Sequence, residues 1–84
     1  MKVFKKDGTL TKQARAITDS VRRSALFFDF GERLIPLFAK TEQDADDIIA
    51  IMDAFGVHCH FSRFESGWRI CVHGMDVIEK IPAS

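Results

Sequence analysis

The sequence predicts one α+β domain with two layers in the order αββαββ(α), in which a four-stranded, mainly antiparallel sheet carries the helices on one face. Its 84 residues are enough for a single modest core. Two segments have helical apolar spacing, and each is followed by two short apolar runs with a glycine at the turn. We therefore expect residues 1–84 to form one domain, with 1–10 as an arm or short strand and 75–84 as a short closing helix and tail.

The first helix is expected to run from Thr11 to about Arg23. A threonine at this position can accept hydrogen bonds from the unpaired amides of the first turn. Apolar residues then recur at helical spacing in a narrow stripe, and the remaining faces are basic and polar. The stripe consists of Leu10, Ala14, Ile17 and Val21.

Two Phe-rich apolar runs follow, at 25–30 and 34–40, and a Gly-Glu dipeptide at 31–32 joins them. A two-residue loop that begins with glycine favours a β-hairpin. In the register that this loop sets, the opposed pairs are Phe28 with Ile35 and Leu26 with Leu37. Pro36 cannot donate a ladder bond, so the second run is expected at the edge of the sheet.

This first hairpin is apolar on both faces, which an antiparallel sheet exposed on one side should not be. Either other elements of the chain cover the second face, or a partner or a second copy of the chain does. The residues expected to mediate such self-association are Phe27, Leu34 and Phe38.

The segment from Thr41 to Gly56 has the most complete helix signals in the chain. Thr41 can cap the first turn, acids follow where the helix dipole favours them, and Gly56 supplies a left-handed stop. The expected apolar stripe is Ala45, Ile48, Ile49, Met52 and Phe55, and the expected exposed acidic face is Glu42, Asp46, Asp47 and Asp53.

A second hairpin is expected from Val57–Phe64 and Trp68–His73, with Ser66-Gly67 at the turn. A two-residue loop there places Phe61 opposite Val72, whereas a four-residue loop places His58 opposite His73. The polar face of either arrangement carries His58, His60, Cys71 and His73, which could bind zinc or another transition metal. No other cofactor is expected.

The formal charge is zero, but it is distributed unevenly. Residues 1–23 hold seven lysines or arginines and two aspartates, and 41–56 hold five acids and no base. Each segment can serve as a charged binding surface. No motif for a catalytic nucleophile, paired catalytic acids or a phosphate loop occurs, so no enzymatic activity is expected.

The two cysteines, Cys59 and Cys71, are expected on opposite faces of the second hairpin, where they cannot form a disulfide. Reduced cysteines indicate a cytoplasmic protein. No apolar run is long enough to span a membrane, and the first residues do not resemble a secretion signal.

The segment from Arg33 to Ile81, read as strand, helix, hairpin and helix, resembles small βαββα regulatory domains of the ferredoxin-like or nitrogen-regulator type. The resemblance rests on helix periodicity with Gly56 and Gly67 and implies no ligand site. In size, neutrality, lack of a catalytic motif and possession of one acidic surface, the chain is also similar to small inhibitors that phages and mobile elements direct at host defence nucleases.

The leading hypothesis from the sequence is therefore a non-catalytic module that binds a basic surface of another protein through the acidic helix, in the manner of such inhibitors. A homodimer is a second expected association. The alternative is nucleic-acid binding through Lys12, Arg15, Arg22 and Arg23, with Phe27, Phe64 or Trp68 stacking on bases if exposed. A weaker alternative is a metal-responsive domain that uses the histidines of the second hairpin.

Overall fold

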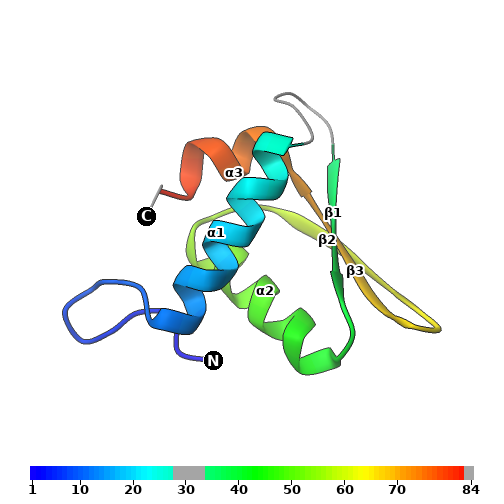
Figure 1. Cartoon of the computed structure of the whole chain (residues 1–84), viewed down its shortest axis with the longest axis horizontal. Coiled ribbons are helices and arrows are strands. Elements are labelled where there is room, and N and C mark those ends of the chain that lie inside the picture. Colours follow the sequence, from blue (N-terminus) through cyan, green and yellow to red (C-terminus); the bar gives the residue numbers. More distant parts are fainter. Residues whose placement is uncertain (28–33, 83–84) are drawn as a thin grey trace.

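The structure is a computed structural model that describes residues 1–27 and 34–82. Within this part, the elements in chain order are α1 (Lys12–Phe27), β1 (Leu34–Ala39), α2 (Glu42–Ala54), β2 (Cys59–Phe64), β3 (Gly67–His73) and α3 (Gly74–Lys80) (Figure 1). The predicted α+β class is confirmed, and from β1 to α3 the element order is the expected βαββα.

The described residues form a three-stranded antiparallel sheet in the order β1-β3-β2. The prediction of a strand over 25–30 is wrong for Ala25–Phe27, which form the last turn of α1. Ala25 lies four residues after Val21 and is buried with it, so the apolar stripe of the helix simply continues. The rest of that strand, with Phe28 and the turn at 31–32, lies outside the described residues.

Leu37 therefore does not pair with Leu26; it lies opposite Ile70 of β3. Pro36 lies in β1, at the edge of the described sheet, as predicted. The expected partner of this strand was local, whereas the residues opposite it in β3 lie from 29 positions (Ala39 to Trp68) to 39 positions (Leu34 to His73) further along the chain.

The second hairpin is present, with its turn at Glu65-Ser66 and Phe64 opposite Gly67. Cys59 opposes Val72 and Phe61 opposes Ile70, which is the register predicted from a four-residue loop. The strands nevertheless pair as far as Phe64 and Gly67, so that only two residues form the turn. Gly67 has a φ of +152°, and a Cβ there would collide with the backbone carbonyl of Ala39. A side chain at this position would therefore strain the approach of β1 to β3.

Helix α2 agrees with its sequence signals. The Thr41 side chain accepts a hydrogen bond from the Asp44 amide at 3.1 Å, and Gly56 has a φ of +71°. Ala45 and Met52 of the predicted stripe are buried, but Ile51, which the stripe left out, is buried completely as well. The helix is thus covered on two sides, by the sheet and by α1.

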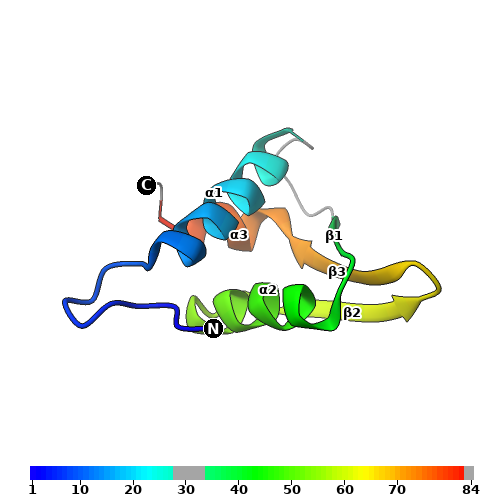
Figure 2. The same cartoon turned by 60° about the horizontal axis from the view of Figure 1, so that its bottom comes forward.

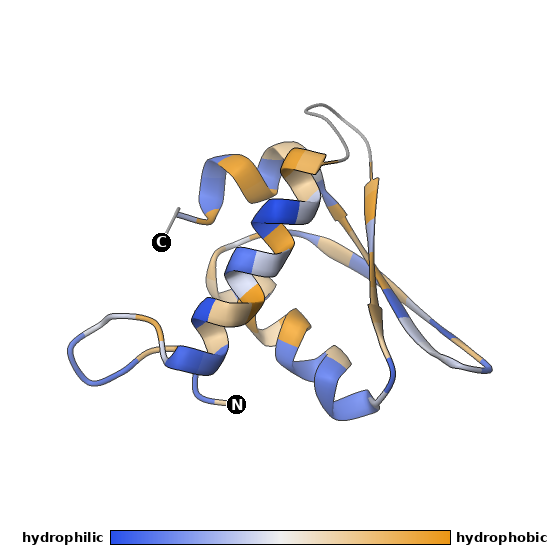
Figure 3. Cartoon of the chain, in the orientation of Figure 1, coloured by the Kyte–Doolittle hydropathy of each residue, from blue (hydrophilic) through white to orange (hydrophobic). Residues whose placement is uncertain are grey.

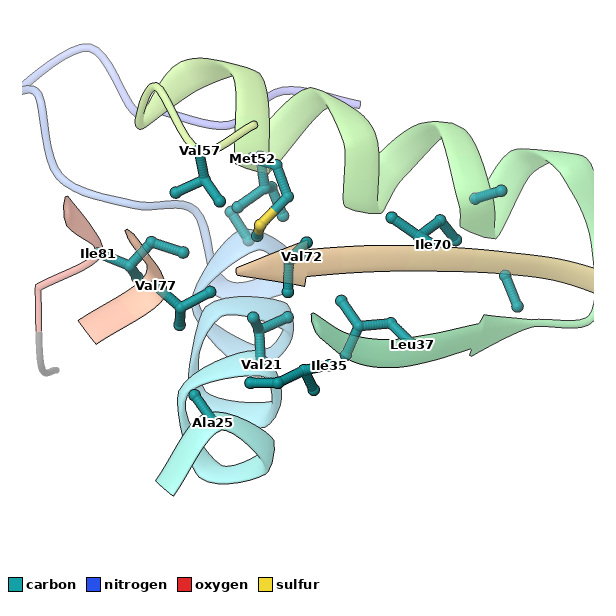
Figure 4. Close-up of a cluster of buried hydrophobic side chains, with 14 residues drawn as sticks. Val21, Ala25, Ile35, Leu37, Met52, Val57, Ile70, Val72, Val77 and Ile81 are labelled. Atoms are coloured by element: carbon teal, nitrogen blue, oxygen red, sulfur yellow. The ribbon is translucent and has the colours of Figure 1, made fainter. Parts of the chain in front are cut away.

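The core lies between the helices and one face of the sheet (Figure 4). Strand residues alternate, so that Ile35, Leu37, Ile70 and Val72 are buried while their neighbours along the chain point to the opposite side. Helix α3 closes the far end with Val77 and Ile81. Figure 2 shows that the turn of the β2-β3 hairpin extends beyond the N-terminal start of α2.

Residues 1–10 form a loop closed by an isolated bridge between Phe4 and Leu10. Asp7 accepts hydrogen bonds from the hydroxyl and amide of Thr9, and these bonds lower the pKa of its carboxyl group. The Phe4 ring packs edge-on against the Phe55 ring, with 5.9 Å between the ring centroids. This contact joins the loop of residues 1–10 to the end of α2.

Candidate functional site

Three of the predicted acidic residues form an exposed row along α2: Glu42, Asp46 and Asp53. Their spacings of four and seven residues place them on one side of the helix. None of the three side chains makes a hydrogen bond or ion pair with another described residue. Figure 3 shows the strongly hydrophilic start of α2, where this acidic row begins.

Asp47 does not belong to the acidic row, and its assignment to an exposed face is wrong. Asp47 is only 4 % exposed to solvent. Its carboxylate accepts hydrogen bonds from Gln43 Nε2 at 2.9 Å and from Gln13 Nε2 of α1 at 3.3 Å, and the Met1 amino group lies 3.8 Å away. Asp47 lies on the side of α2 that α1 covers, so its role is to join the two helices.

One of the basic residues predicted to contact nucleic acid from α1 has a structural role instead. Arg22 is half-buried and donates hydrogen bonds to the backbone carbonyls of Ile78 and Ile81, which tie α1 to α3. Lys12, Arg15 and Arg23 are exposed. Arg22 is therefore not available to contact phosphates, and three cations of the predicted set remain on the surface.

The three histidines lie close together, as the hairpin register implied. The ring centroids of His58 and His60 are 4.8 Å apart, and those of His60 and His73 are 6.4 Å apart. Yet no group of three or more His, Cys, Asp or Glu side chains in the described part of the chain is arranged to hold a metal ion. We therefore propose no zinc site here.

Both cysteines are free thiols, and they point to opposite faces of the sheet because Cys71 opposes His60 while Cys59 opposes Val72. Cys59 shares a hollow of about 280 Å³ with Asp53 and His58. These are residue types that activate nucleophilic cysteines elsewhere. Here, however, burial and then the Asp53 carboxylate raise the pKa of the Cys59 thiol, which disfavours the reactive thiolate.

The raised pKa makes a prediction for Cys59. Asp53→Asn is expected to lower that pKa, because it removes a negative charge that opposes thiolate formation. Alkylation of Cys59 by iodoacetamide should then reach its half-maximal rate at a lower pH than in the wild type, as followed by mass spectrometry of the Cys59 peptide. Asp46→Asn is the matched control and should leave the profile unchanged; identical profiles for all three proteins would contradict the assigned cause.

The predicted self-association residues are exposed, but they are not on one hairpin face. Leu34 and Phe38 point outward from β1, whereas Phe27 ends α1. Two adjoining hollows, of about 460 and 420 Å³, lie between α1, β1 and α2. Their shared lining is apolar and consists of Ala16, Ile17, Phe38 and Ile48.

No described helix packs on the side of the sheet opposite the core, and we call this side the outer sheet face. It comprises Leu34, Pro36, Phe38, His60, Ser62, Phe64, Gly67, Arg69, Cys71 and His73. The sequence pattern pointed to its histidines and to Phe64 as a base-stacking residue, but not to Arg69 on its central strand. The missing information was the pairing of β1 with β3, which brings Phe38 beside Arg69.

The chain matches no known protein family, and no similar curated protein or solved structure was found. In the described residues, no helix combines the length and apolar character that crossing a membrane requires.

Proposed function

We propose that the protein is a small non-catalytic module that binds a basic surface of another protein through the acidic row of α2. The observation that carries this proposal is the line of exposed carboxylates at Glu42, Asp46 and Asp53, which find no cationic partner among the described residues. Unpaired like charges on one helix side repel one another, so a basic partner would relieve a repulsion that the free protein retains.

The position of Asp53 supports binding over simple helix stabilisation. Acids stabilise the first turn of a helix, but Asp53 lies in the last turn, where the helix dipole disfavours a carboxylate. That turn holds no basic residue. A carboxylate there costs the helix a small amount of stability, which is consistent with a role in contact with a partner.

The acidic row is also well ordered for recognition. The Thr41 cap fixes the start of α2, and Ile51 and Met52 are fully buried beneath it. At 1.5 Å of rise per residue, the row from Glu42 to Asp53 spans about 16 Å. A helix held in this way loses little backbone freedom on binding, and the row directs association through its charge.

A protein that handles nucleic acid is the proposed class of target, because its basic groove binds a row of phosphates and could accept a row of carboxylates instead. Occupation of that groove would block the nucleic acid, so the module would act as an inhibitor. Its two free cysteines fit action in a reducing cytoplasm.

The test is affinity capture from a lysate treated with nuclease, with wild type and Glu42→Lys/Asp46→Lys/Asp53→Lys as baits. A partner is expected to bind the wild type, to be lost by the triple variant, and to show an affinity that falls with salt once it is purified. The matched control is Glu65→Lys/Glu79→Lys, which reverses exposed acids outside the row and should retain the partner.

Two outcomes would contradict the proposal. One is recovery of nucleic acid alone, indifferent to the triple variant, which would favour the exposed cations of α1. The other is a partner that the triple variant binds as well as the wild type does. Asp47 stays unchanged in all baits because its burial makes it part of the fold.

A further inference from the structure

Two phenylalanine rings stand exposed on the outer sheet face. Phe38 of β1 is 67 % exposed and Phe64 of β2 is 42 % exposed. Their ring centroids are 6.3 Å apart with an interplanar angle of 85°, so they contact each other only edge to face. Much of each ring remains open to solvent, where it adds little to the stability of the free protein.

Arg69 lies between these two aromatic strands. It belongs to the central strand β3, directly opposite Phe38 on one side and Ser62 on the other. Its side chain is exposed and makes no ion pair with a described carboxylate. By contrast, Arg63 on the opposite sheet face packs over the Trp68 ring at 5.3 Å.

The outer sheet face contains no acidic residue in any of its three strands. Beyond the aromatic pair and Arg69 it carries the imidazoles of His60 and His73. A ligand that fits this surface has negative charge and flat, stackable groups. A second copy of the chain fits less well, because face-to-face packing would oppose two copies of Arg69 without a carboxylate between them.

We propose that the outer sheet face binds single-stranded nucleic acid, with bases stacked on Phe38 and Phe64 and a phosphate held by Arg69. Aromatic platforms with a cation beside them bind single strands with little sequence preference, because every base presents a π-face. A duplex keeps its bases stacked on each other and cannot use the rings in this way. The proposal is independent of the acidic row, which lies on α2 and not on the sheet.

The test is fluorescence anisotropy of the full chain with a labelled oligothymidylate, an oligouridylate and a duplex of the same length. The single strands should bind more tightly than about 100 μM, the weak end of non-specific affinity, and the duplex should bind more weakly. Phe38→Ala and Phe64→Ala should each weaken binding about fivefold or more. With one or two phosphate contacts, the slope of log K against log salt should be only about −1.

The chain offers matched controls for both residue types. Phe61 is 61 % exposed on the opposite face of β2, so Phe61→Ala removes an equally accessible ring from the wrong side of the sheet. Arg63→Ala is the control for Arg69→Ala, because it removes an arginine from the opposite face of the sheet. Both controls should bind like the wild type.

Three results would overturn the proposal: no binding of either single strand, equal binding of the duplex, or equal losses in the controls and in the Phe38 and Phe64 variants. A steep salt slope lost on reversing Lys12, Arg15 and Arg23 would move nucleic-acid binding to α1. If the wild type is a dimer that Phe38→Ala/Phe64→Ala separates, and no oligonucleotide binds, the outer sheet face is a dimer interface.

Discussion

Asp47→Lys is expected to unfold the protein or leave it barely folded, whereas the same change one residue earlier, Asp46→Lys, should leave the fold intact. Asp47 is buried and accepts hydrogen bonds from Gln13 and Gln43, while Asp46 is exposed. A lysine at 47 would bury an ammonium group that these amide nitrogens cannot satisfy, at a cost of about 3–5 kcal/mol. A domain of this size has a total stability of roughly 4–12 kcal/mol.

Thermal unfolding followed by circular dichroism checks this expectation. Asp47→Asn serves as a second comparison, because it keeps the shape and one acceptor oxygen, and it should cost about 1 kcal/mol. A folded Asp47→Lys variant as stable as Asp46→Lys would show that residue 47 is not buried in solution. The result also matters for functional work, since a charge-reversal series that included position 47 would confuse lost binding with lost folding.

Ile51→Ala should be among the most costly truncations in α2, with a loss of about 3–4 kcal/mol in the free energy of unfolding. Ile51 is completely buried, so truncation both removes apolar contacts and leaves a cavity that the packed helices cannot fill. Ile49→Ala is the matched control, because Ile49 is only half-buried on the same helix and should lose clearly less.

Urea unfolding at equilibrium measures both changes, provided that the slope of free energy against denaturant is the same in each protein. Equal losses for the two variants would contradict the complete burial of Ile51. A smaller loss at Ile51 than at Ile49 would support the apolar stripe predicted from the sequence, which includes Ile49 and leaves out Ile51.

The prediction of α2 succeeded because its signals are local. A threonine cap and a glycine stop act within one turn of the helix ends, so Thr41 and Gly56 mark those ends without help from the rest of the chain. The second hairpin has the same character, because period-two alternation and a nearby turn determine which of its residues share a face.

The prediction of a strand over residues 25–27 was wrong because the sequence pattern there is ambiguous over a short range. Residues 25–27 fit an apolar strand and also the last turn of an amphipathic helix, and four-residue spacing from Val21 to Ala25 favours the helix once α1 has neighbours to pack against. Strand β1 then pairs with β3, a contact between segments distant in sequence that no local pattern specifies.

The candidate surfaces divide in the same way. Exposure of Glu42, Asp46 and Asp53 follows from the helix period alone, because these residues lie opposite most of the apolar stripe. Asp47 looks equivalent in a sequence pattern, and so does Arg22 on α1. In the structure, however, Asp47 accepts a hydrogen bond from Gln13 of α1. Arg22 donates hydrogen bonds to the carbonyls of Ile78 in α3 and of Ile81 just after it.

By itself, then, the amino-acid sequence determined the class of the fold, the limits of α2, the faces of the second hairpin and the separation of charge along the chain, all through interactions between near neighbours. Packing determined which charges remain free, because burial depends on how helices cross and not on their own periods. It also placed Phe38 directly opposite Arg69 and brought the rings of Phe38 and Phe64 together across the sheet, since strand order is set by the joint burial of the opposite face against the helices.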